Sequence, residues 1–239
     1  MQRVLNIKIL ITSGPTRVPL DSVRFLTNRS AGRFGTLLAD AALKKGFQVT
    51  FVCGVGSQTP KSHRSLRLIS VETNRDVAKV LKKELMRGRY AAVIHAMAVL
   101  DFQPAHFKNI KTKTKRGVWR LKLVPTPKII DQIKKWAPKT LLVGFKLETG
   151  VSQNMLLQEA RRLLKKSKAD FILANQLSEG KDSSHAGWLL DDKGRVVGKA
   201  KGKAKLARLI LSYVTPAPYR STGQAPAGVQ SSGFRLSPE

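Results

Sequence analysis

The sequence predicts an α/β fold of the Rossmann-like, doubly wound kind, with a mostly parallel sheet and a basic flap or hairpin inserted into it. Apolar strand patterns alternate with amphipathic helical patterns along the chain, which favours parallel strands joined by right-handed crossovers. A polar Gly/Ser loop separates the first strand pattern from the first helix pattern. Between residues 106 and 124 the alternation is interrupted by a segment rich in Lys and Arg, which we interpret as the flap.

The first strand pattern is the apolar run Ile7 to Ile11, and the first helix pattern covers Phe34 to Lys45. The stretch 28–35 joins them and contains Ser and Gly residues directly before the helix. Backbone N–H groups at a helix start lack intrahelical partners and carry the positive end of the helix dipole. Glycine lets a phosphate approach such a backbone closely, so this stretch predicts a phosphate cradle. Its spacing matches neither G-x-G-x-x-G nor G-x-x-x-x-G-K, and a turn that only packs the helix on the strand stays open as an alternative.

The next elements continue the α/β pattern. Gly46 is a predicted C-cap of the first helix. Strands are predicted over 48–53, 66–71 and 91–96, with a Gly/Ser/Pro loop over 54–65 and a helix from the cap Thr73 to about Met86. Ligands of such sheets bind beyond the carboxyl ends of the strands, which is where Gly14, Gly54 and Asp101 fall.

In the second half of the chain, alternation of apolar and polar residues predicts a strand over Val118–Val124 within the basic flap. Pro127 at a first helical position opens a predicted helix. The remaining predicted elements are the helix 128–135, the strand 140–145, the helix 152–166, the strand 171–174, a hairpin over 188–197 that turns at 192–194, and the helix 204–214. The segment 215–239 is dominated by Pro, Gly, Ser, Gln and Ala, so we expect a disordered tail after a single domain over 1–214.

Composition narrows the class of protein. The chain has 239 residues, of which 42% are hydrophobic, enough for one sizeable core. It shows neither an apolar run of about 18 residues nor a signal-peptide pattern, so we expect no membrane contact and a cytoplasmic location. The single cysteine, Cys53, lies in a strand pattern and favours a buried residue over a nucleophile. His95 favours a packed side chain over a metal ligand, and no cluster has zinc-site spacing.

The charge is unusual, with 44 Lys and Arg against 15 Asp and Glu and a formal net charge of +29. Such a balance attracts phosphate-bearing partners, either nucleic acid or a small anionic substrate. A nucleic-acid-binding α/β module is therefore an alternative, supported by the basic stretches 108–122, 161–168 and 193–208 but weakened by their few aromatic residues. An NAD-dependent enzyme is a third interpretation, although the first strand is not followed by G-x-G-x-x-G.

Five segments, in order, resemble the phosphopantothenate–cysteine ligase family. They are 11–17, 21–32, 96–104 together with 111–113, 143–149, and 169–175. The resemblance implies a ligase that joins 4′-phosphopantothenate to cysteine in coenzyme A synthesis, with a nucleoside triphosphate and Mg²⁺. It also implies a homodimer that does not require nucleic acid. In many bacteria this module follows a flavin-dependent decarboxylase, and because the chain starts at the ligase's first strand we expect neither that domain nor a flavin here.

The resemblance implies activation of the carboxylate as an acyl-nucleotide with release of pyrophosphate, followed by attack of the cysteine amine. Such a reaction depends on positioning and charge stabilisation. Catalytic roles are implied for Asn28, which holds the acyl-nucleotide, and for Lys111, whose cation neutralises the developing phosphate charge. Substrate and phosphate contacts are implied for Arg24, Ser30, Gly32, Gly35, Ala98 and Asp101. Nucleotide contacts are implied for Gly14, Asp101, Lys111, Pro127, Lys128, Ile129, Ile130, Phe145, Asn175, Arg162 and Lys166. No metal ligand is predicted, because Mg²⁺ arrives with the triphosphate.

The chain departs from the family pattern in two places. Lysines that many members carry before Asp170 fall on Leu163 and Ser167 here, so Arg162 and Lys166 would serve only after a register shift. Gln103 stands where Arg is common. The segment 145–148 resembles members that use ATP as well as some bacterial ones, many of which use CTP, and we favour CTP while ATP stays open.

Overall fold

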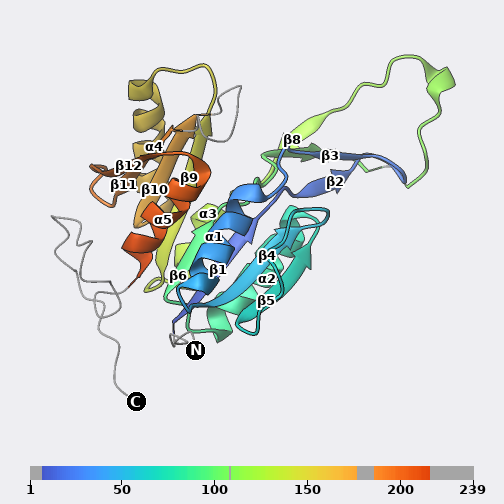
Figure 1. The fold of residues 1–239 in the computed structure, drawn as a ribbon. Coiled ribbons are helices and arrows are strands. Elements are labelled where there is room, and N and C mark those ends of the chain that lie inside the picture. Colours follow the sequence, from blue (N-terminus) through green and yellow to red (C-terminus); the bar gives the residue numbers. More distant parts are fainter. Residues whose placement is uncertain (1–6, 108, 177–185, 216–239) are drawn as a thin grey trace.

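A computed structural model describes residues 7–107, 109–176 and 186–215, and it is built on one eight-stranded sheet (Figure 1). The strand order is β12-β11-β10-β9-β6-β1-β4-β5. The strands are β1 (Lys8–Ser13), β4 (Gln48–Gly54), β5 (Leu66–Val71), β6 (Ala92–His95), β9 (Leu141–Glu148), β10 (Phe171–Gln176), β11 (Ala186–Asp191) and β12 (Val196–Lys201). The first six pair in parallel, whereas β11 and β12 form an antiparallel extension of the sheet. Counted along the chain, the parallel strands lie in the order 3-2-1-4-5-6, and the predicted doubly wound fold is confirmed.

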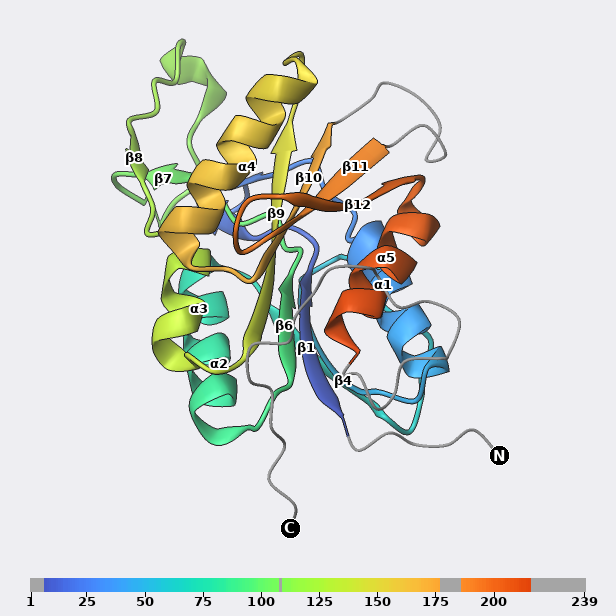
Figure 2. The same ribbon diagram turned by 90° about the vertical axis from the view of Figure 1, so that its left-hand side faces the viewer.

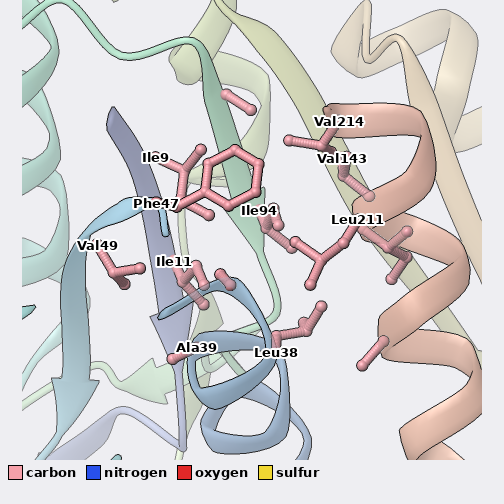
Figure 3. Close-up of a cluster of buried hydrophobic side chains, with 14 of the residues drawn as sticks. Ile9, Ile11, Leu38, Ala39, Phe47, Val49, Ile94, Val143, Leu211 and Val214 are labelled. Carbon is pink, nitrogen blue, oxygen red and sulfur yellow. The ribbon is translucent and has the colours of Figure 1, made fainter. Parts of the chain in front are cut away.

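Helices cover both faces of the sheet (Figure 2). One face carries α1 (Arg33–Lys44) and α5 (Lys203–Val214), and the other carries α2 (Asn74–Arg87), α3 (Ile130–Trp136) and α4 (Gln153–Ser167). Strand β1 contributes to both cores because alternate side chains point to opposite faces. Ile9 and Ile11 pack with Leu38 of α1 and Leu211 of α5 (Figure 3), whereas Leu10 joins the core under the other helices. A continuous apolar strand pattern is the expected consequence of burial on both faces.

The predicted helix ends are largely confirmed. Thr73 caps α2 through a capping box, in which its hydroxyl accepts from the Asp76 N–H and the Asp76 carboxylate accepts from the Thr73 N–H. Ser152 caps α4. Gly46 has a φ of 86° directly after the end of α1, a conformation that glycine adopts without steric cost. The short helix predicted from residue 128 begins two residues later, at Ile130.

Two small antiparallel hairpins project from the carboxyl end of the sheet. The first pairs β2 (Arg17–Pro19) with β3 (Phe25–Thr27), and the second pairs β7 (Phe102–Pro104) with β8 (Leu123–Pro125). The segment between β7 and β8 is the predicted flap, and it carries a short 3-10 helix, η1 (Thr114–Arg116). The predicted tail lies outside the described residues except for Thr215.

The strand predicted over 118–124 is confirmed only at its end, because β8 covers Leu123–Pro125 and residues 118–122 form no strand. Its partner β7 is three residues long and ends at Pro104, which has no N–H to donate to a ladder. Val118 is 81% exposed, so the alternation of apolar residues in the flap does not correspond to burial within this chain.

Candidate active site

Several of the predicted site residues, among them Gly14, Asn28 and Ala98, gather where the strand order reverses, at the carboxyl ends of β1 and β6. The loop 96–101 leaves β6 and crosses the end of β1. The Ala98 N–H donates to the Gly14 carbonyl at 2.8 Å, and the Thr16 N–H donates to the Ala98 carbonyl at 3.2 Å. Ala98 is thereby fixed on both sides to the segment that follows β1.

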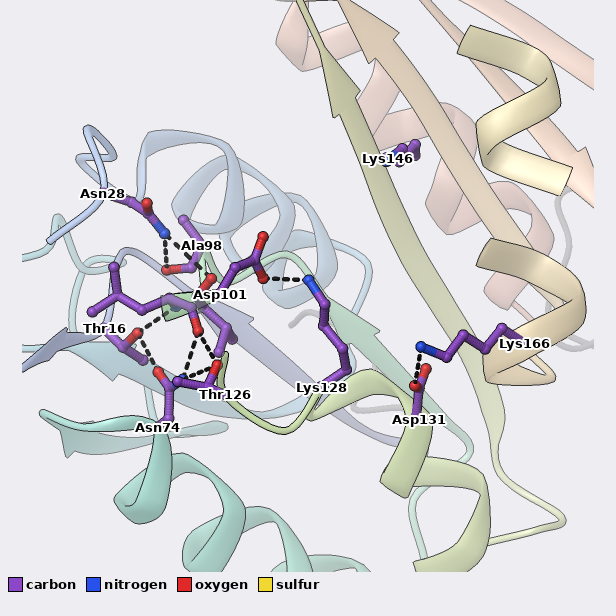
Figure 4. Close-up of polar contacts among 12 residues, drawn as sticks. Thr16, Asn28, Asn74, Ala98, Asp101, Thr126, Lys128, Asp131, Lys146 and Lys166 are labelled. Atoms are coloured by element: carbon purple, nitrogen blue, oxygen red, sulfur yellow. Dashed lines mark hydrogen bonds and ion pairs between the residues drawn. The ribbon is translucent and has the colours of Figure 1, made fainter. Parts of the chain in front are cut away.

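Asn28 lies at the same place, directly after β3. Its amide Nδ2 donates to the carbonyls of Ala98 at 3.1 Å and Val99 at 3.3 Å (Figure 4). The predicted residues Asn28 and Ala98, which are 70 positions apart in the sequence, are therefore in direct contact. The bonds fix which way the Asn28 amide points, as a residue that orients a substrate requires.

The glycine-rich segment surrounds the amino terminus of α1. Gly32 caps the helix with a φ of 76°, and its carbonyl accepts a hydrogen bond from the Ser13 hydroxyl at 2.9 Å. The Ser30 N–H donates to the Asn28 carbonyl at 2.9 Å, which folds the chain tightly before the helix. The first turn of α1 contains no acidic residue, so the positive end of its dipole remains available to an anion.

Two of the predicted glycines also have packing reasons. A Cβ at Gly35 would lie 2.2 Å from the Ser13 hydroxyl, so glycine is needed for α1 to approach β1. A Cβ at Gly14 would lie 1.8 Å from the Ser57 hydroxyl, and Gly14 has a φ of 73°. Close packing of helix on strand and a phosphate cradle are thus compatible interpretations of the same segment.

Further residues predicted to bind nucleotide border this region. Lys128 forms an ion pair with Asp101, and the Asp101 carbonyl accepts from the Thr126 N–H at 2.9 Å (Figure 4). Both charged side chains are about half exposed, at 49% for Lys128 and 59% for Asp101. The Asp101–Lys128 pair is therefore open to a ligand and contributes little to stability by itself.

The remaining residues of the predicted base pocket are more enclosed. Ile129 and Ile130 lie at the start of α3 and are buried in the core, and the Ile130 side chain packs over Gly144. Phe145 makes an edge-to-face contact with Phe34 of α1, with ring centroids 5.5 Å apart. Asn175 lies beside Leu147 near the carboxyl ends of β10 and β9.

Arg162 and Lys166, predicted to contact the triphosphate, point elsewhere. Arg162 pairs with Glu159 on α4, and Lys166 lies 3.2 Å from the Asp131 carboxylate on α3 (Figure 4). Both cations lie on the exposed side of α4 and have acidic partners there, and the structure does not bring them to Asn28.

Arg24 and the flap segment that carries Lys111 meet at the far end of the β2–β3 hairpin. Arg24 pairs with Asp21 at 2.6 Å, donates to the Thr112 carbonyl at 3.4 Å, and lies over the Trp119 ring. Arg24 lies four positions before Asn28 along an extended strand, a distance of about 13 Å. Within one chain the structure therefore leaves Lys111, next to Thr112, apart from Asn28.

Asp21 is an important residue for which the sequence analysis assigned no role. It is 2% exposed, and its carboxylate accepts from the N–H groups of Thr112 at 3.0 Å, Val23 at 2.9 Å and Arg24 at 2.9 Å. Burial by itself raises the pKa of Asp21, but these bonds and the Arg24 guanidinium outweigh it and hold the pKa well below its ordinary value. A charged Asp21 therefore anchors the flap to the hairpin.

Asn74 was also missed, because one polar residue in a first helical turn carries no pattern. Its amide accepts from the Thr16 hydroxyl at 2.6 Å and donates to the Leu100 carbonyl at 2.7 Å and to the Thr126 hydroxyl at 3.1 Å (Figure 4). Its position after β5, at the carboxyl edge of the sheet, is the signal that would have drawn attention to it.

His95 and Cys53 are packed, as predicted. Burial lowers the pKa of His95 to about 4, and its Nδ1 lies 2.8 Å from the Thr12 hydroxyl. That hydroxyl also accepts from the Met97 N–H at 3.3 Å, which ties it to the segment after β6. Burial raises the pKa of the Cys53 thiol.

Three or more His, Cys, Asp or Glu side chains do not converge as a metal site anywhere in the described ranges. The described helices are also too short or too polar to cross a bilayer. A cavity of about 510 Å³ lies at the opposite, amino-terminal end of β1, β4 and β5, where Lys8, Arg64 and Arg67 line it, and it is separate from the residues above.

Comparisons with known proteins agree with this arrangement. Residues 4–217 match the family model of the DNA/pantothenate metabolism flavoprotein C-terminal domain. The coenzyme A biosynthesis bifunctional protein CoaBC of Thermococcus kodakarensis is 36% identical over 172 residues, covering 71% of this chain and 41% of that protein. Its counterpart in Borreliella burgdorferi is 37% identical over 175 residues, covering 72% and 43%. The chain thus spans about two fifths of the length of these curated relatives.

Among solved structures, the DNA/pantothenate metabolism flavoprotein from Streptococcus pneumoniae is 28% identical and superimposes with a TM-score of 0.80. The match covers 87% of this chain and 98% of that one. The similarity therefore extends over almost the whole of that solved chain.

Proposed function

The chain belongs to the DNA/pantothenate metabolism flavoprotein C-terminal domain family, and from this premise we propose that it joins 4′-phosphopantothenate to cysteine through an acyl-nucleotide. Family membership confirms the resemblance to phosphopantothenate–cysteine ligases. The curated relatives described above are named as coenzyme A biosynthesis proteins. The observation that carries the proposal is the contact of Asn28 with the Ala98 and Val99 carbonyls, beside the amino terminus of α1.

The chemistry suits a site without a protein nucleophile. A carboxylate is a poor acyl donor, so it attacks the α-phosphate of the nucleotide and pyrophosphate leaves. The cysteine amine then attacks the acyl carbon, and the nucleoside monophosphate leaves. The backbone N–H groups at the start of α1 stabilise phosphate charge, and Asn28 orients the acyl-nucleotide through its amide.

We assign nucleotide binding to the side of the site near Asp101. Lys128 replaces Arg162 and Lys166 as the cation for the triphosphate, because it lies beside Asp101 at the carboxyl edge of the sheet, whereas the other two lie on the exposed side of α4. Magnesium would arrive bound to the phosphates, whose charge it partly neutralises. CTP is the favoured nucleotide, and ATP is the alternative.

We further propose a homodimer formed through the two projecting hairpins. Large apolar side chains are at least 42% exposed on these hairpins and the flap: Val23, Phe25, Phe102, Phe107, Ile110, Val118, Leu121 and Leu123. Apolar surface concentrated on one projection is typical of a protein interface. A second copy bound there would bring its own flap, and we propose that the partner's flap supplies the lysine that Asn28 lacks in its own chain. A reduced, buried Cys53 fits a cytoplasmic location.

The experiment is an assay of pyrophosphate release. Purified protein with Mg²⁺, 4′-phosphopantothenate, cysteine and either CTP or ATP should release pyrophosphate and form phosphopantothenoylcysteine, identified by mass. Omission of cysteine should limit release to about one equivalent per site, because the acyl-nucleotide then accumulates. Absence of product with both nucleotides would overturn the proposal.

A further inference from the structure

We propose that Asn74, on the first turn of α2, is a positioning residue that holds three segments of the active site in register. The expected loss of kcat/KM rests on the proposed ligase function, whereas the expected loosening of the loop 96–101 does not. Asn74 touches neither Asn28 nor the Asp101–Lys128 pair. It acts through the backbone and hydroxyl groups to which those residues are attached (Figure 4).

The amide of Asn74 connects three segments that are distant in sequence. Its Oδ1 accepts from Thr16, two residues after Gly14, at 2.6 Å. Its Nδ2 donates to the carbonyl of Leu100, next to Asp101, at 2.7 Å, and to the hydroxyl of Thr126 at 3.1 Å. Thr126 lies two residues before Lys128. Each segment contributes a predicted site residue, and one side chain bridges all three.

The surrounding bonds close the network. The Leu100 N–H donates to the Thr16 hydroxyl at 2.9 Å, and the Thr126 hydroxyl donates to the Leu100 carbonyl at 2.5 Å. The Thr16 and Thr126 hydroxyls are therefore both donor and acceptor. Thr16 is fully buried and Thr126 is 8% exposed, so water does not readily replace a lost partner.

Only an amide satisfies every partner of this network. The Leu100 carbonyl can only accept, so Asn74 must present a donor to it. The Thr16 hydroxyl already accepts from Leu100, so its proton needs an acceptor, which is Oδ1. Aspartate would keep the acceptor for Thr16 but would place a negative oxygen against the Leu100 carbonyl. Alanine would leave the Thr16 proton and part of the Leu100 carbonyl without their partners.

Helix α2 does not need Asn74 for its own cap. The capping box is formed by Thr73 and Asp76, and the Asn74 side chain is directed away from it toward the loop after β6. Thr73 therefore provides a matched control: it is adjacent in sequence and important for the same helix end, but the hydrogen bonds of its side chain remain within the capping box.

The test compares Asn74→Ala with Thr73→Ala in the full chain, by steady-state kinetics and by hydrogen exchange. Asn74→Ala should lower kcat/KM by about 100-fold, because a displacement of about 1 Å in a positioned group has effects of this size. After correction for the folded fraction, its kcat should be lower and its KM for nucleotide higher than in wild type. Thr73→Ala should melt a few degrees lower but keep kcat/KM within about threefold of wild type.

Hydrogen exchange provides a readout that needs no enzymatic activity. Amides of residues 96–101 should exchange at least about tenfold faster in Asn74→Ala than in wild type. In Thr73→Ala these amides should exchange at the wild-type rate, and faster exchange should appear instead in the first turn of α2. Asn74→Asp should match Asn74→Ala, because the donor to Leu100 is lost in both. If the loop exchanges at the wild-type rate in Asn74→Ala, or if both alanine variants lose activity equally, Asn74 is only a helix residue and the inference fails. If wild-type protein releases no pyrophosphate, the proposed function fails, and the exchange rates still decide the role of Asn74.

Discussion

The loop 96–101 and the flap segment around Thr112 are both assigned to one active site, but the chain holds them in very different ways. The loop is tied to the segments after β1, β3 and β8 by hydrogen bonds of Ala98, Leu100 and Asp101. The flap segment is tied through Thr112 to Asp21 and Arg24 at the far end of the β2–β3 hairpin. The buried hydroxyl of Thr112 has no partner within the described part of the chain.

The fold by itself arranges the loop 96–101, whereas the flap is held at fewer points. Buried polar groups in a finished structure nearly always have partners, as those of the loop do. The flap differs in its exposed apolar residues, which are the observation behind the homodimer proposed above. In that proposal a second copy of the chain, with its substrates, completes the surroundings of the flap.

The largest effect on activity is expected at Asn28, which contacts the loop 96–101. Asn28→Ala should lower kcat by about 100-fold to 1,000-fold, because it removes an oriented hydrogen-bonding group from the reacting centre. Its circular dichroism and melting should remain close to those of wild type, since Asn28 is partly exposed. Wild-type turnover by a folded Asn28→Ala protein would exclude this residue from the site.

The next effect concerns the half that we assign to the partner subunit. Lys111→Ala should reduce kcat by a similar order, since a cation that neutralises transferring phosphate charge is lost. When Asn28→Ala and Lys111→Ala chains are co-expressed with different tags, about a quarter of wild-type activity should return, because half of the dimers are mixed and each holds one intact site.

Failure of complementation would locate Lys111 in the site of its own chain and would require the flap to swing toward Asn28. The mass of the wild-type protein from light scattering provides the control. A monomer at assay concentrations would contradict the shared site directly.

Much of the fold could be predicted because its central strands are buried on both faces. The apolar runs that form β1, β4 and β6 leave few alternatives, and Thr73 marks the start of α2. The alternating residues before Leu123 were misleading, because the same pattern also suits a surface that another chain covers. Contacts such as Asn28 with Ala98 were accessible only through the family resemblance, because local patterns do not report pairs 70 residues apart. The structure pairs Arg162 and Lys166 with Glu159 and Asp131 instead of bringing them to Asn28, and sequence spacing alone does not fix which face of α4 points to the site.

A smaller effect is expected where the flap meets the hairpin. Asp21→Asn should weaken flap docking and raise the KM for substrate by about tenfold while changing kcat less, because the charged bonds to Arg24 and the Thr112 N–H are weakened. The readout is the rate of proteolysis within residues 105–122, which should rise in parallel. Equal KM values and equal proteolysis in the two proteins would show that Asp21 does not anchor the flap.

The pH dependence of this anchor follows from its lowered pKa. A group whose folded pKa is depressed stabilises the folded state above its unfolded pKa, here about 3.9, and loses that contribution as pH falls toward the folded pKa. Proteolysis of the flap in wild-type protein should therefore be constant between about pH 5 and 8. In more acidic solution, below about pH 4, the melting temperature of wild type should fall more steeply than that of Asp21→Asn.

The smallest effects are expected from the two cations on α4. Lys166→Ala removes a partly exposed pair with Asp131, and such pairs contribute about 0–1 kcal/mol. Because neither Lys166 nor Arg162 approaches Asn28, each alanine variant should keep kcat/KM within about twofold of wild type.

Lys128→Gln should instead raise the KM for the triphosphate by about fivefold, with a smaller effect on binding of the monophosphate, because the proposed contact is to the terminal phosphates. A larger loss in Lys166→Ala than in Lys128→Gln would reverse the assignment and return the triphosphate to α4, which would require that helix to turn or shift when nucleotide binds.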